Sequence, residues 1–348
     1  MRRIVFLTSC VMMLYMLVMQ GCKVGPNYEQ PKPLFDSTAV YRFDPVLGDT
    51  VLNLSWWELF SDPQLKQLIE IALEENQDIL IATSRIEEAR AFLGFTRADV
   101  YPNITISAQG QRSNLLSLGG ISEQIDVRNN FFVAPALSWE IDFWGKLRRA
   151  NEAAYAEMLA SEYGRRSIQV SLISAVAATY FQLIDLDQRL EIAHSTLGSR
   201  REYSRIIEER FNEGYTAQID LDQARIQEYI AEASVPFFER QVAFAENALS
   251  VLLGRPPASI VRGLELYDQP IPPDIPPGIP SDLLLRRPDI LEVEQVLIAQ
   301  NAQIGVAVAQ RFPSISLTAT YGFASNDLSS LFSGNVWAIG GSLLSPLF

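Results

Sequence analysis

Two carboxylates, Glu140 and Asp142, stand two positions apart in a segment that alternates between apolar and polar residues. On a β-strand this spacing places both side chains on one face, together with Ser138. A pair of acids could act as general acid and general base. We favour the simpler interpretation, a hydrated polar wall, because the sequence offers no nucleophile–base set to accompany them. The chain is therefore not expected to be an enzyme.

The composition also argues against metal and nucleic-acid sites. The chain has one histidine, His194, and two cysteines, Cys10 and Cys22. Zinc sites need three or four such ligands close together, so we expect no metal. The net charge of −13 disfavours nucleic acid as a partner, because phosphates attract a basic surface.

The first 21 residues have the pattern of an export signal. Arg2 and Arg3 precede an apolar run from Ile4 to Met19. A transmembrane anchor is the alternative, but the run is short for a span of about 20 residues. The ending Gly21-Cys22 resembles the cleavage site of bacterial lipoproteins, although Met19 stands where leucine or valine is usual. That resemblance implies a covalent lipid on Cys22 and, because Lys23 follows, sorting to the outer membrane.

Helical periodicity dominates the rest of the chain. Apolar spacing predicts one helix of about 35 residues from Pro63 to Ala98, opened by Asp62 as its cap. Residues 146–211 contain no proline and predict a helix of about 100 Å. A turn around Gly214 leads to a further helix from about Thr216, which Pro236 is expected to bend or break. Helices of this length form rods or coiled arrays.

Two segments between these helices predict β-hairpins. In the first, one face carries apolar residues and the other small or acidic residues: Val133, Leu137, Trp139, Ile141 and Phe143 against Ala134, Ala136, Ser138, Glu140 and Asp142. Residues 314–323 repeat the alternation, and Trp337, Ile339 and Leu343 extend it. Each strand is long enough to cross a bilayer on a tilt. Periodicity alone leaves an ordinary soluble sheet equally possible.

The two hairpin regions also repeat one pattern at a fixed distance of 211 residues. Asp78, Gly94, Ala98 and Pro102 correspond to Asp289, Gly305, Ala309 and Pro313. A fixed period indicates a duplicated unit. The second copy stops before a counterpart of the long helices, so we expect an incomplete second repeat. The predicted divisions are a signal peptide (1–21), a lipid-anchored strap (22–62), a first repeat (63–255), a proline-rich linker (256–280) and an incomplete second repeat (281–348).

Four strands cannot close a barrel with a lumen, and an open sheet edge cannot face lipid. Several chains must therefore contribute strands to one barrel. This inference follows from the lengths of the segments.

The chain resembles the outer-membrane efflux proteins, the TolC-like ducts of tripartite pumps, in their lipoprotein branch. The similarity covers nearly the whole chain after the signal. The motifs that carry it are Gly21-Cys22-Lys23-Val24-Gly25-Pro26-Asn27-Tyr28, Trp56-Trp57, Phe60-Ser61-Asp62-Pro63, Ser138-Trp139-Glu140-Ile141-Asp142-Phe143-Trp144-Gly145, Leu252-Leu253-Gly254, Arg286-Arg287-Pro288-Asp289-Ile290 and Phe312-Pro313.

The resemblance implies an α+β membrane protein that forms a homotrimer in the outer membrane. Four strands per chain would make one oligomeric transmembrane β-barrel, and long antiparallel helices would extend it as a periplasmic tunnel. Ser138, Glu140 and Asp142 would face the lumen. The partners would be a periplasmic adaptor protein, an inner-membrane pump and outer-membrane lipid.

The turn between the long helices is the expected adaptor contact. Arg210, Gly214, Thr216 and Asp220 resemble the helix-tip pattern of the family, although glycine and threonine also serve as ordinary helix caps. The leading hypothesis is thus a passive exit duct for small molecules such as drugs, without a cofactor other than the lipid. The alternative is a truncated, non-conducting lipoprotein remnant of the same family.

Overall fold

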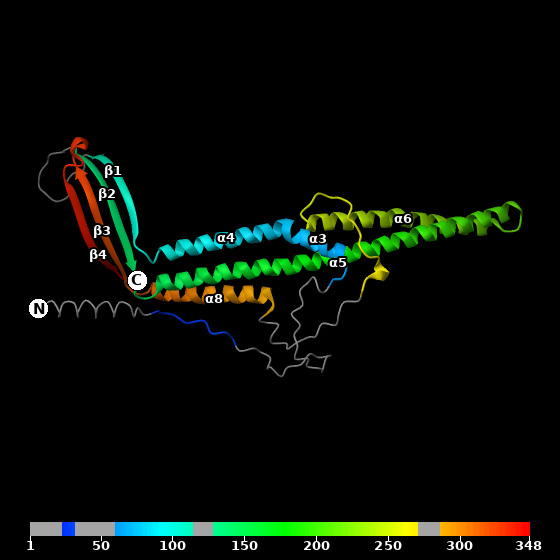
Figure 1. Cartoon of the computed structure of the whole chain (residues 1–348), viewed down its shortest axis with the longest axis horizontal. Helices are drawn as coiled ribbons and strands as arrows, with labels where there is room; N and C mark the ends of the chain where they lie inside the picture. The colour runs from blue at the N-terminus through cyan, green and yellow to red at the C-terminus, as the bar shows by residue number, and fades with distance from the viewer. Residues whose placement is uncertain (1–22, 32–59, 114–127, 271–285) are drawn as a thin grey trace. The chain divides into compact units, whose positions relative to one another are not determined.

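The protein is described from a computed structural model that covers residues 23–31, 60–113, 128–270 and 286–348 (Figure 1). The predicted signal peptide, Cys22, most of the strap and part of the proline-rich linker lie outside these residues. The chain forms two compact units. Among the described residues, unit 1 comprises 23–31, 86–113, 128–162 and 292–348, and unit 2 comprises 60–85, 163–270 and 286–291.

Long helices and two β-hairpins make up the fold, which confirms the predicted α+β architecture. The helices are α3 (Pro63–Glu75), α4 (Gln77–Ala98), α5 (Lys146–Asn212), α6 (Gln218–Leu252) and α8 (Pro288–Ala309), with short 3-10 turns η1 (Leu266–Asp268) and η2 (Leu328–Ser330). The strands are β1 (Asn103–Ser113), β2 (Arg128–Ile141), β3 (Ser314–Ser325) and β4 (Asn335–Leu344).

Helix α5 is the longest element, and its 67 residues correspond to about 100 Å of helix. In unit 2 it pairs with α6 as an antiparallel hairpin (Figure 1). Small apolar clusters hold the two helices together; one contains Ala193 and Leu197 of α5 with Ala231 and Val235 of α6. This packing flanks Pro236, and α6 continues through the proline as one helix. Of the two expected effects of Pro236, a bend or a break, the break is therefore absent.

The predicted helix of about 35 residues is wrong in one respect, because Asn76 divides it into α3 and α4. Asn76 has extended backbone angles, with φ −64° and ψ 129°. Its side-chain oxygen accepts hydrogen bonds from the N–H groups of Asp78 and Ile79, at 2.9 and 3.3 Å, and so caps α4. Its amide donates to the Leu252 carbonyl oxygen at 2.9 Å. Apolar periodicity continues across the break and therefore could not reveal it.

The four strands form one antiparallel sheet in the order β1-β2-β3-β4. Each strand pairs with its neighbour along the chain, and β2 with β3 joins the two hairpins. Residues directly opposite share a face. One face therefore carries mainly apolar side chains, among them Ile104, Leu137, Trp139, Leu317, Tyr321, Trp337 and Ile339. The other carries small and polar ones such as Thr105, Ser138, Ser316 and Ser342.

The 211-residue repeat is visible in the elements themselves. Helix α4 runs over Gln77–Ala98 and α8 over Pro288–Ala309, so both ends are displaced by 211 positions. Strand β1 begins at Asn103 and β3 at Ser314, with the same displacement. The sequence echo therefore corresponds to a repeated helix–strand unit.

Unit 2 has a core built from three helices. Leu65, Ile69 and Ala72 of α3 meet Val176 and Leu183 of α5 and Leu249 of α6, and all are buried. The N-terminal cap of α3, Asp62, lies at the edge of this core and is only 1% exposed. As predicted, its carboxylate accepts from the first turn of α3, namely the N–H groups of Gln64 and Leu65.

The same carboxylate also gathers donors from distant segments. The Tyr180 hydroxyl donates to Oδ2 at 2.9 Å, the Leu264 N–H at 3.0 Å and the Gln269 side-chain amide at 2.9 Å. Burial alone would raise the pKa of Asp62, but these hydrogen bonds outweigh it and hold the pKa below its usual value. Asp62 therefore fastens the segment after α6 to α3 and α5.

We predict that Asp62→Asn destabilises unit 2 by about 1–3 kcal/mol at neutral pH, because an amide cannot accept from all of these donors. A carboxyl whose pKa is lowered on folding stabilises the protein above its unfolded pKa, and this contribution is lost as the pH falls through the folded pKa. The difference between variant and parent should therefore shrink below about pH 4. Thermal unfolding monitored by circular dichroism between pH 3 and pH 7 measures it.

Asp185→Asn is the matched control, since Asp185 is half-buried and, among the described residues, its side chain bonds only Arg189 on its own helix. Its effect should remain below about 0.5 kcal/mol. An Asp62→Asn variant with the stability of this control at pH 7 would contradict the role assigned to Asp62.

Candidate functional site

The polar face of the sheet holds two of the predicted site residues. Ser138 lies opposite Thr318 and Glu140 opposite Ser316 in the β2–β3 register. The Glu140 carboxylate forms an ion pair with Lys146 at 2.5 Å. Ser138 is exposed and Glu140 half-buried. The strand alternation thus places these two side chains as the sequence predicts.

Asp142 lies one position beyond the end of the strand, which corrects the prediction that it continues the strand. Strand β2 ends at Ile141. The Asp142 carboxylate turns to the start of α5, where it accepts from the N–H groups of Leu147 and Arg148 at 3.1 and 2.9 Å. It also forms an ion pair with the Arg148 guanidinium at 3.1 Å. Free N–H groups at a helix start attract a carboxylate, and this ends the strand. Phe143, also predicted on the strand, stacks edge-on against Trp144 instead.

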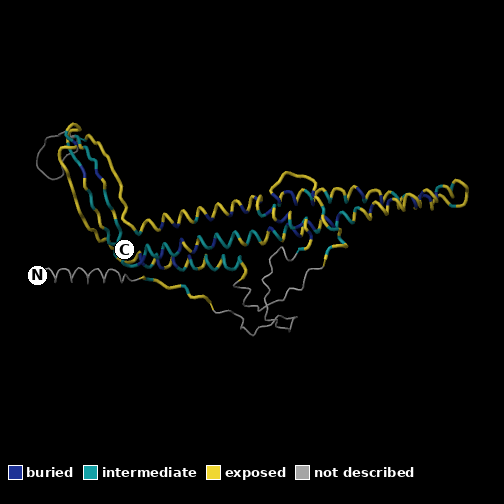
Figure 2. Tube along the Cα trace, in the orientation of Figure 1, coloured by how far each residue is buried: buried dark blue, intermediate teal, exposed yellow. Residues whose placement is uncertain are grey.

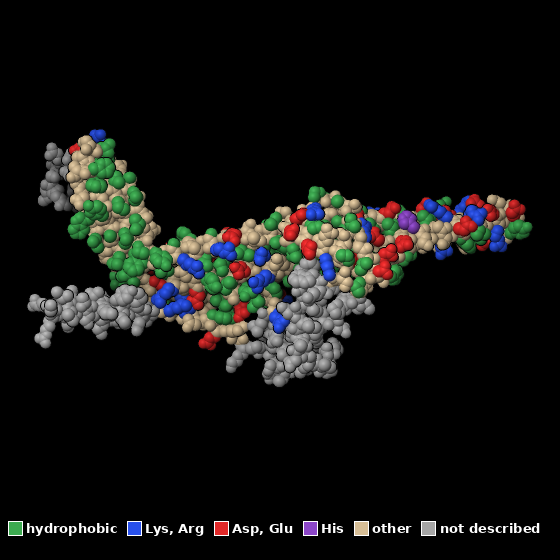
Figure 3. Space-filling model, in the orientation of Figure 1, with side chains coloured by type: hydrophobic (Ala, Val, Ile, Leu, Met, Phe, Trp, Pro, Cys, Tyr) green, Lys and Arg blue, Asp and Glu red, His purple; other side chains and the backbone are tan. Residues whose placement is uncertain are grey.

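The apolar face of the sheet is open to its surroundings. Ile106 and Ile339 are each 79% exposed, and Trp337 is 70% exposed. Figure 3 shows hydrophobic side chains gathered over the sheet. Exposed apolar surface on this scale marks contact with another protein or with lipid.

Among the described residues, no further strand pairs with either edge of the sheet. Every residue of β4 is exposed, and so is all of β1 except its last residue (Figure 2). Such edges present rows of N–H and C=O groups that can pair with another strand.

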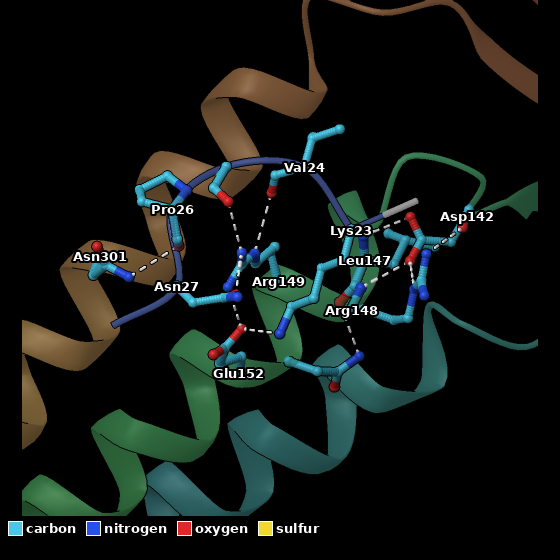
Figure 4. Close-up of polar contacts among 12 residues, drawn as sticks. Lys23, Val24, Pro26, Asn27, Asp142, Leu147, Arg148, Arg149, Glu152 and Asn301 are labelled. Atoms are coloured by element: carbon cyan, nitrogen blue, oxygen red, sulfur yellow. Dashed lines mark hydrogen bonds and ion pairs between the residues drawn. The ribbon is translucent and has the colours of Figure 1, made fainter. Parts of the chain in front are cut away.

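Next to the sheet, the segment Lys23–Tyr28 is bound by a buried arginine. Arg149, in the first turn of α5, has a side chain with no exposed surface. Its guanidinium donates to the carbonyl oxygens of Val24 and Gly25, at 3.2 and 3.0 Å, and to the Asn27 side chain at 2.8 Å. A fourth bond reaches Glu152 at 3.0 Å (Figure 4). Three of its four acceptors thus come from the N-terminal segment.

Two glycines allow this close packing. Gly25 has a φ of +89°, which glycine adopts without strain, and a Cβ there would lie 2.6 Å from the Gly305 Cα atom on α8. A Cβ on Gly305 would in turn lie 2.8 Å from the Arg149 side chain. The segment, α5 and α8 can meet here because neither glycine has a side chain.

Further polar contacts surround the arginine. Lys23 pairs with Glu152 at 2.6 Å. Burial alone would raise the pKa of Glu152, but the hydrogen bonds from Lys23 and Arg149 hold it below the usual value. The Tyr28 hydroxyl donates to Glu294 at 2.9 Å; burial and this bond raise the pKa of the tyrosine. The Asn301 amide donates to the Pro26 carbonyl at 3.1 Å.

Trp144 connects this cluster to both central strands. It lies just after β2, and its indole N–H donates to the carbonyl of Pro313, just before β3, at 2.9 Å. Its ring stacks on Phe312 with 4.6 Å between centroids. Its own carbonyl accepts from the Val24 N–H at 3.2 Å.

The predicted adaptor residues lie together at the turn between α5 and α6. Gly214 has a φ of +81°, and its N–H donates to the Phe211 carbonyl at 2.9 Å. The Arg210 carbonyl accepts from Tyr215 N–H at 2.8 Å. Asp220 accepts from the Ala217 N–H at 3.2 Å, so Ala217 and not Thr216 occupies the cap position of α6. Arg210, Gly214 and Asp220 are exposed.

Sequence reasoning missed the Arg149 cluster. An arginine in a helix is normally exposed, and nothing local marks this one as buried. The available signals were Gly25, Asn27 and Gly305, each of which belongs to a motif or to the repeat. Cys22, the predicted lipid site, lies outside the described residues. Across the residues that are described, no group of three or more His, Cys, Asp or Glu side chains could hold a metal ion.

Comparison with known proteins identifies this combination of sheet and helices. A family model described as outer membrane efflux protein matches residues 68–255 and 279–348. The chain is 35% identical to the solvent efflux pump outer membrane protein SrpC of Pseudomonas putida, over 97% of this chain and 73% of that protein. It is 33% identical to the probable outer membrane lipoprotein SilC of Salmonella typhimurium, over 95% of this chain and 72% of that protein.

A solved structure shares the fold. The crystal structure of a membrane protein from Pseudomonas aeruginosa aligns with a TM-score of 0.83 and 32% identity, covering 94% of this chain and 74% of that one. The family consists of outer-membrane channels, components of tripartite efflux systems, that are passive and not enzymes. On these grounds the chain belongs to the outer membrane efflux protein family.

Proposed function

We propose that this chain works as a homotrimeric, lipid-anchored exit duct for small molecules in the outer membrane, reached through a periplasmic adaptor and an inner-membrane pump. The observation that carries the proposal is the open four-stranded sheet, with one exposed apolar face and two exposed edges. A membrane-spanning sheet must close, since lipid cannot pair with backbone groups at an edge.

Closure by identical copies requires β4 of one copy to pair with β1 of the next. Such head-to-tail contacts form a ring when the rotation closes. Three copies would supply twelve strands, enough for a barrel with an open interior. The apolar face would meet lipid, and the polar face with Ser138 and Glu140 would line the lumen. Asp142 would lie at the lumen's base, beside the start of α5.

We assign the membrane-spanning role to the sheet and not to the helices. Of the described helices, α5 alone includes a stretch long and apolar enough to cross a bilayer by composition. Its residues Leu172, Val176 and Leu183 are buried in the core of unit 2. We therefore assign the long helices to a tunnel wall outside the membrane.

The helix tip is proposed as the adaptor contact. Arg210, Gly214, Thr216 and Asp220 lie at the α5–α6 turn, where Tyr215 and Ile219 add exposed apolar surface of 76% and 63%. Exposed aromatic and aliphatic side chains beside charges are typical of protein interfaces. SrpC is named as part of a solvent efflux pump, which is consistent with small organic molecules as cargo.

The first prediction concerns closure of the barrel. Thr105 and Ser342 lie two residues in from the helix-proximal ends of β1 and β4, and both belong to the polar face. We expect Thr105→Cys with Ser342→Cys to give disulfide-linked dimers and trimers on oxidation. Within one chain, β1 and β4 are separated by two strands, at about 4.8 Å per step, which is too far for a disulfide. Non-reducing electrophoresis distinguishes the products.

The matched control is Thr105→Cys with Leu343→Cys, because Leu343 belongs to the opposite face. It should remain monomeric under the same oxidation. Equal cross-linking of both pairs, or of neither, would refute the proposed strand pairing.

The second prediction concerns conduction. The purified chain should produce discrete current steps in a planar lipid bilayer. Glu140→Gln leaves Lys146 without its ion-pair partner and adds one positive charge per copy, so the reversal potential in a salt gradient should shift towards anions. Glu140→Asp keeps the charge and serves as the control. An absence of current would favour a non-conducting member of the family.

The third prediction concerns the anchor. If Cys22 carries the lipid, Cys22→Ser should abolish incorporation of radiolabelled palmitate, while the proposed β-barrel should still keep the protein in the membrane fraction at high salt. Cys10→Ser, within the predicted signal peptide, should change neither result. Labelling that persists in Cys22→Ser would place the lipid elsewhere.

A further inference from the structure

We infer that Arg149 is a positioning residue. It holds the segment Lys23–Tyr28 between α5 of the first repeat and α8 of the second, and the bound segment sets the register of β2 against β3. The inference goes beyond the channel role and does not depend on trimer formation or on the lipid. It concerns how the two halves of one chain are joined.

The register between β2 and β3 has to be fixed by contacts outside the sheet. Only the β2–β3 pairing connects the two hairpins in the sheet. Within each hairpin the second strand follows the first after one connecting segment (residues 114–127 or 326–334), whereas β2 and β3 are separated by helices and a long connection. A displacement by two residues would preserve both faces of the sheet, so the hydrophobic pattern alone does not exclude it.

The helices that continue these strands are the elements the segment joins. Helix α5 begins at Lys146, after β2 ends at Ile141, and α8 ends at Ala309, before β3 begins at Ser314. Because these connections are short, the position of α8 against α5 determines the position of β3 against β2. Trp144 and Pro313, bonded to each other, lie within the two connections.

The N-terminal segment fills the space between α5 and α8. Arg149 of α5 holds Val24, Gly25 and Asn27, while Asn301 and Glu294 of α8 bond Pro26 and Tyr28. Gly25 rests directly against Gly305, and Gly305 lies against Arg149. The Val24 N–H also bonds Trp144 at the strand connection. Every described residue from Lys23 to Tyr28 therefore contacts α5, α8 or the connection between sheet and helix.

Arg149 is the residue on which this arrangement depends. A buried guanidinium needs acceptors, and Glu152 is the single acceptor that α5 supplies. Without the segment, the charge would keep one partner of four. Docking of the segment and burial of Arg149 against Gly305 therefore occur together.

The test uses the full chain in detergent with two cysteine pairs. Ser138→Cys with Thr318→Cys reports the native register, since these residues are directly opposite. Ser138→Cys with Thr320→Cys reports a displacement by two. Hydrogen exchange at Val24 reports release of the segment. Each pair is placed in the parent, in Arg149→Met and in Arg189→Met, an exposed arginine on the same helix.

Arg149→Met keeps a long side chain but leaves no unpaired charge. We expect exchange at Val24 to accelerate by about tenfold or more, the equivalent of one lost charge-assisted hydrogen bond. The native disulfide should decrease and the displaced one should form. Asn27→Ala, which removes one acceptor, should give a smaller change in the same direction. Exchange around Tyr180 in unit 2 should match the parent, which shows that the variants have folded.

Two results would overturn the inference. Unchanged exchange at Val24 in Arg149→Met would show that the arginine does not hold the segment. Faster exchange at Val24 combined with the parental yield of the native disulfide would show that the segment does not set the register. Arg189→Met should behave as the parent in every measurement.

Discussion

A β-strand inside a lipid bilayer must pair every backbone N–H and C=O group, because lipid offers no replacement for water. The sheet of this chain meets that requirement at its three internal pairings and leaves it open at β1 and β4. The exposed edges β1 and β4 are the places where this constraint is not met by the described residues. In the proposed ring of copies, the two edges would be complementary halves of one contact.

Buried charges hold the helical parts in place. Asp62 in unit 2 and Arg149 in unit 1 are both almost inaccessible, and each bonds segments more than a hundred residues away. Their partners are mostly neutral amides, hydroxyls and carbonyls, so each charge is solvated by the protein itself. Apolar packing brings long helices together but leaves them able to slide; directional bonds to a buried charge remove that freedom.

The helices and strands could be predicted from the sequence, but the long-range hydrogen bonds that hold them together could not. Period-two and helical patterns revealed both hairpins and the long helices, and alternation placed Ser138 and Glu140 on the polar face. Asn76 escaped notice because the apolar period continues across it and its partner, the Leu252 carbonyl, is distant in the chain. Asp142 was assigned to the strand because the alternating pattern does not show that its carboxylate binds the N–H groups at the start of α5. Asp62 was recognisable as a cap, whereas its bonds to Tyr180 and Gln269 depend on tertiary structure.

The contact of Gly25 with Gly305 makes the two repeats structurally different. Gly305 is the repeat counterpart of Gly94, and within the described part of the chain a Cβ on Gly94 would meet nothing within 4 Å. The two repeat-related glycines therefore face different packing constraints: a Cβ at position 305 would lie 2.8 Å from the Arg149 side chain, whereas a Cβ at position 94 would be accommodated. The N-terminal segment therefore makes the two repeats inequivalent at a position where both carry the same residue.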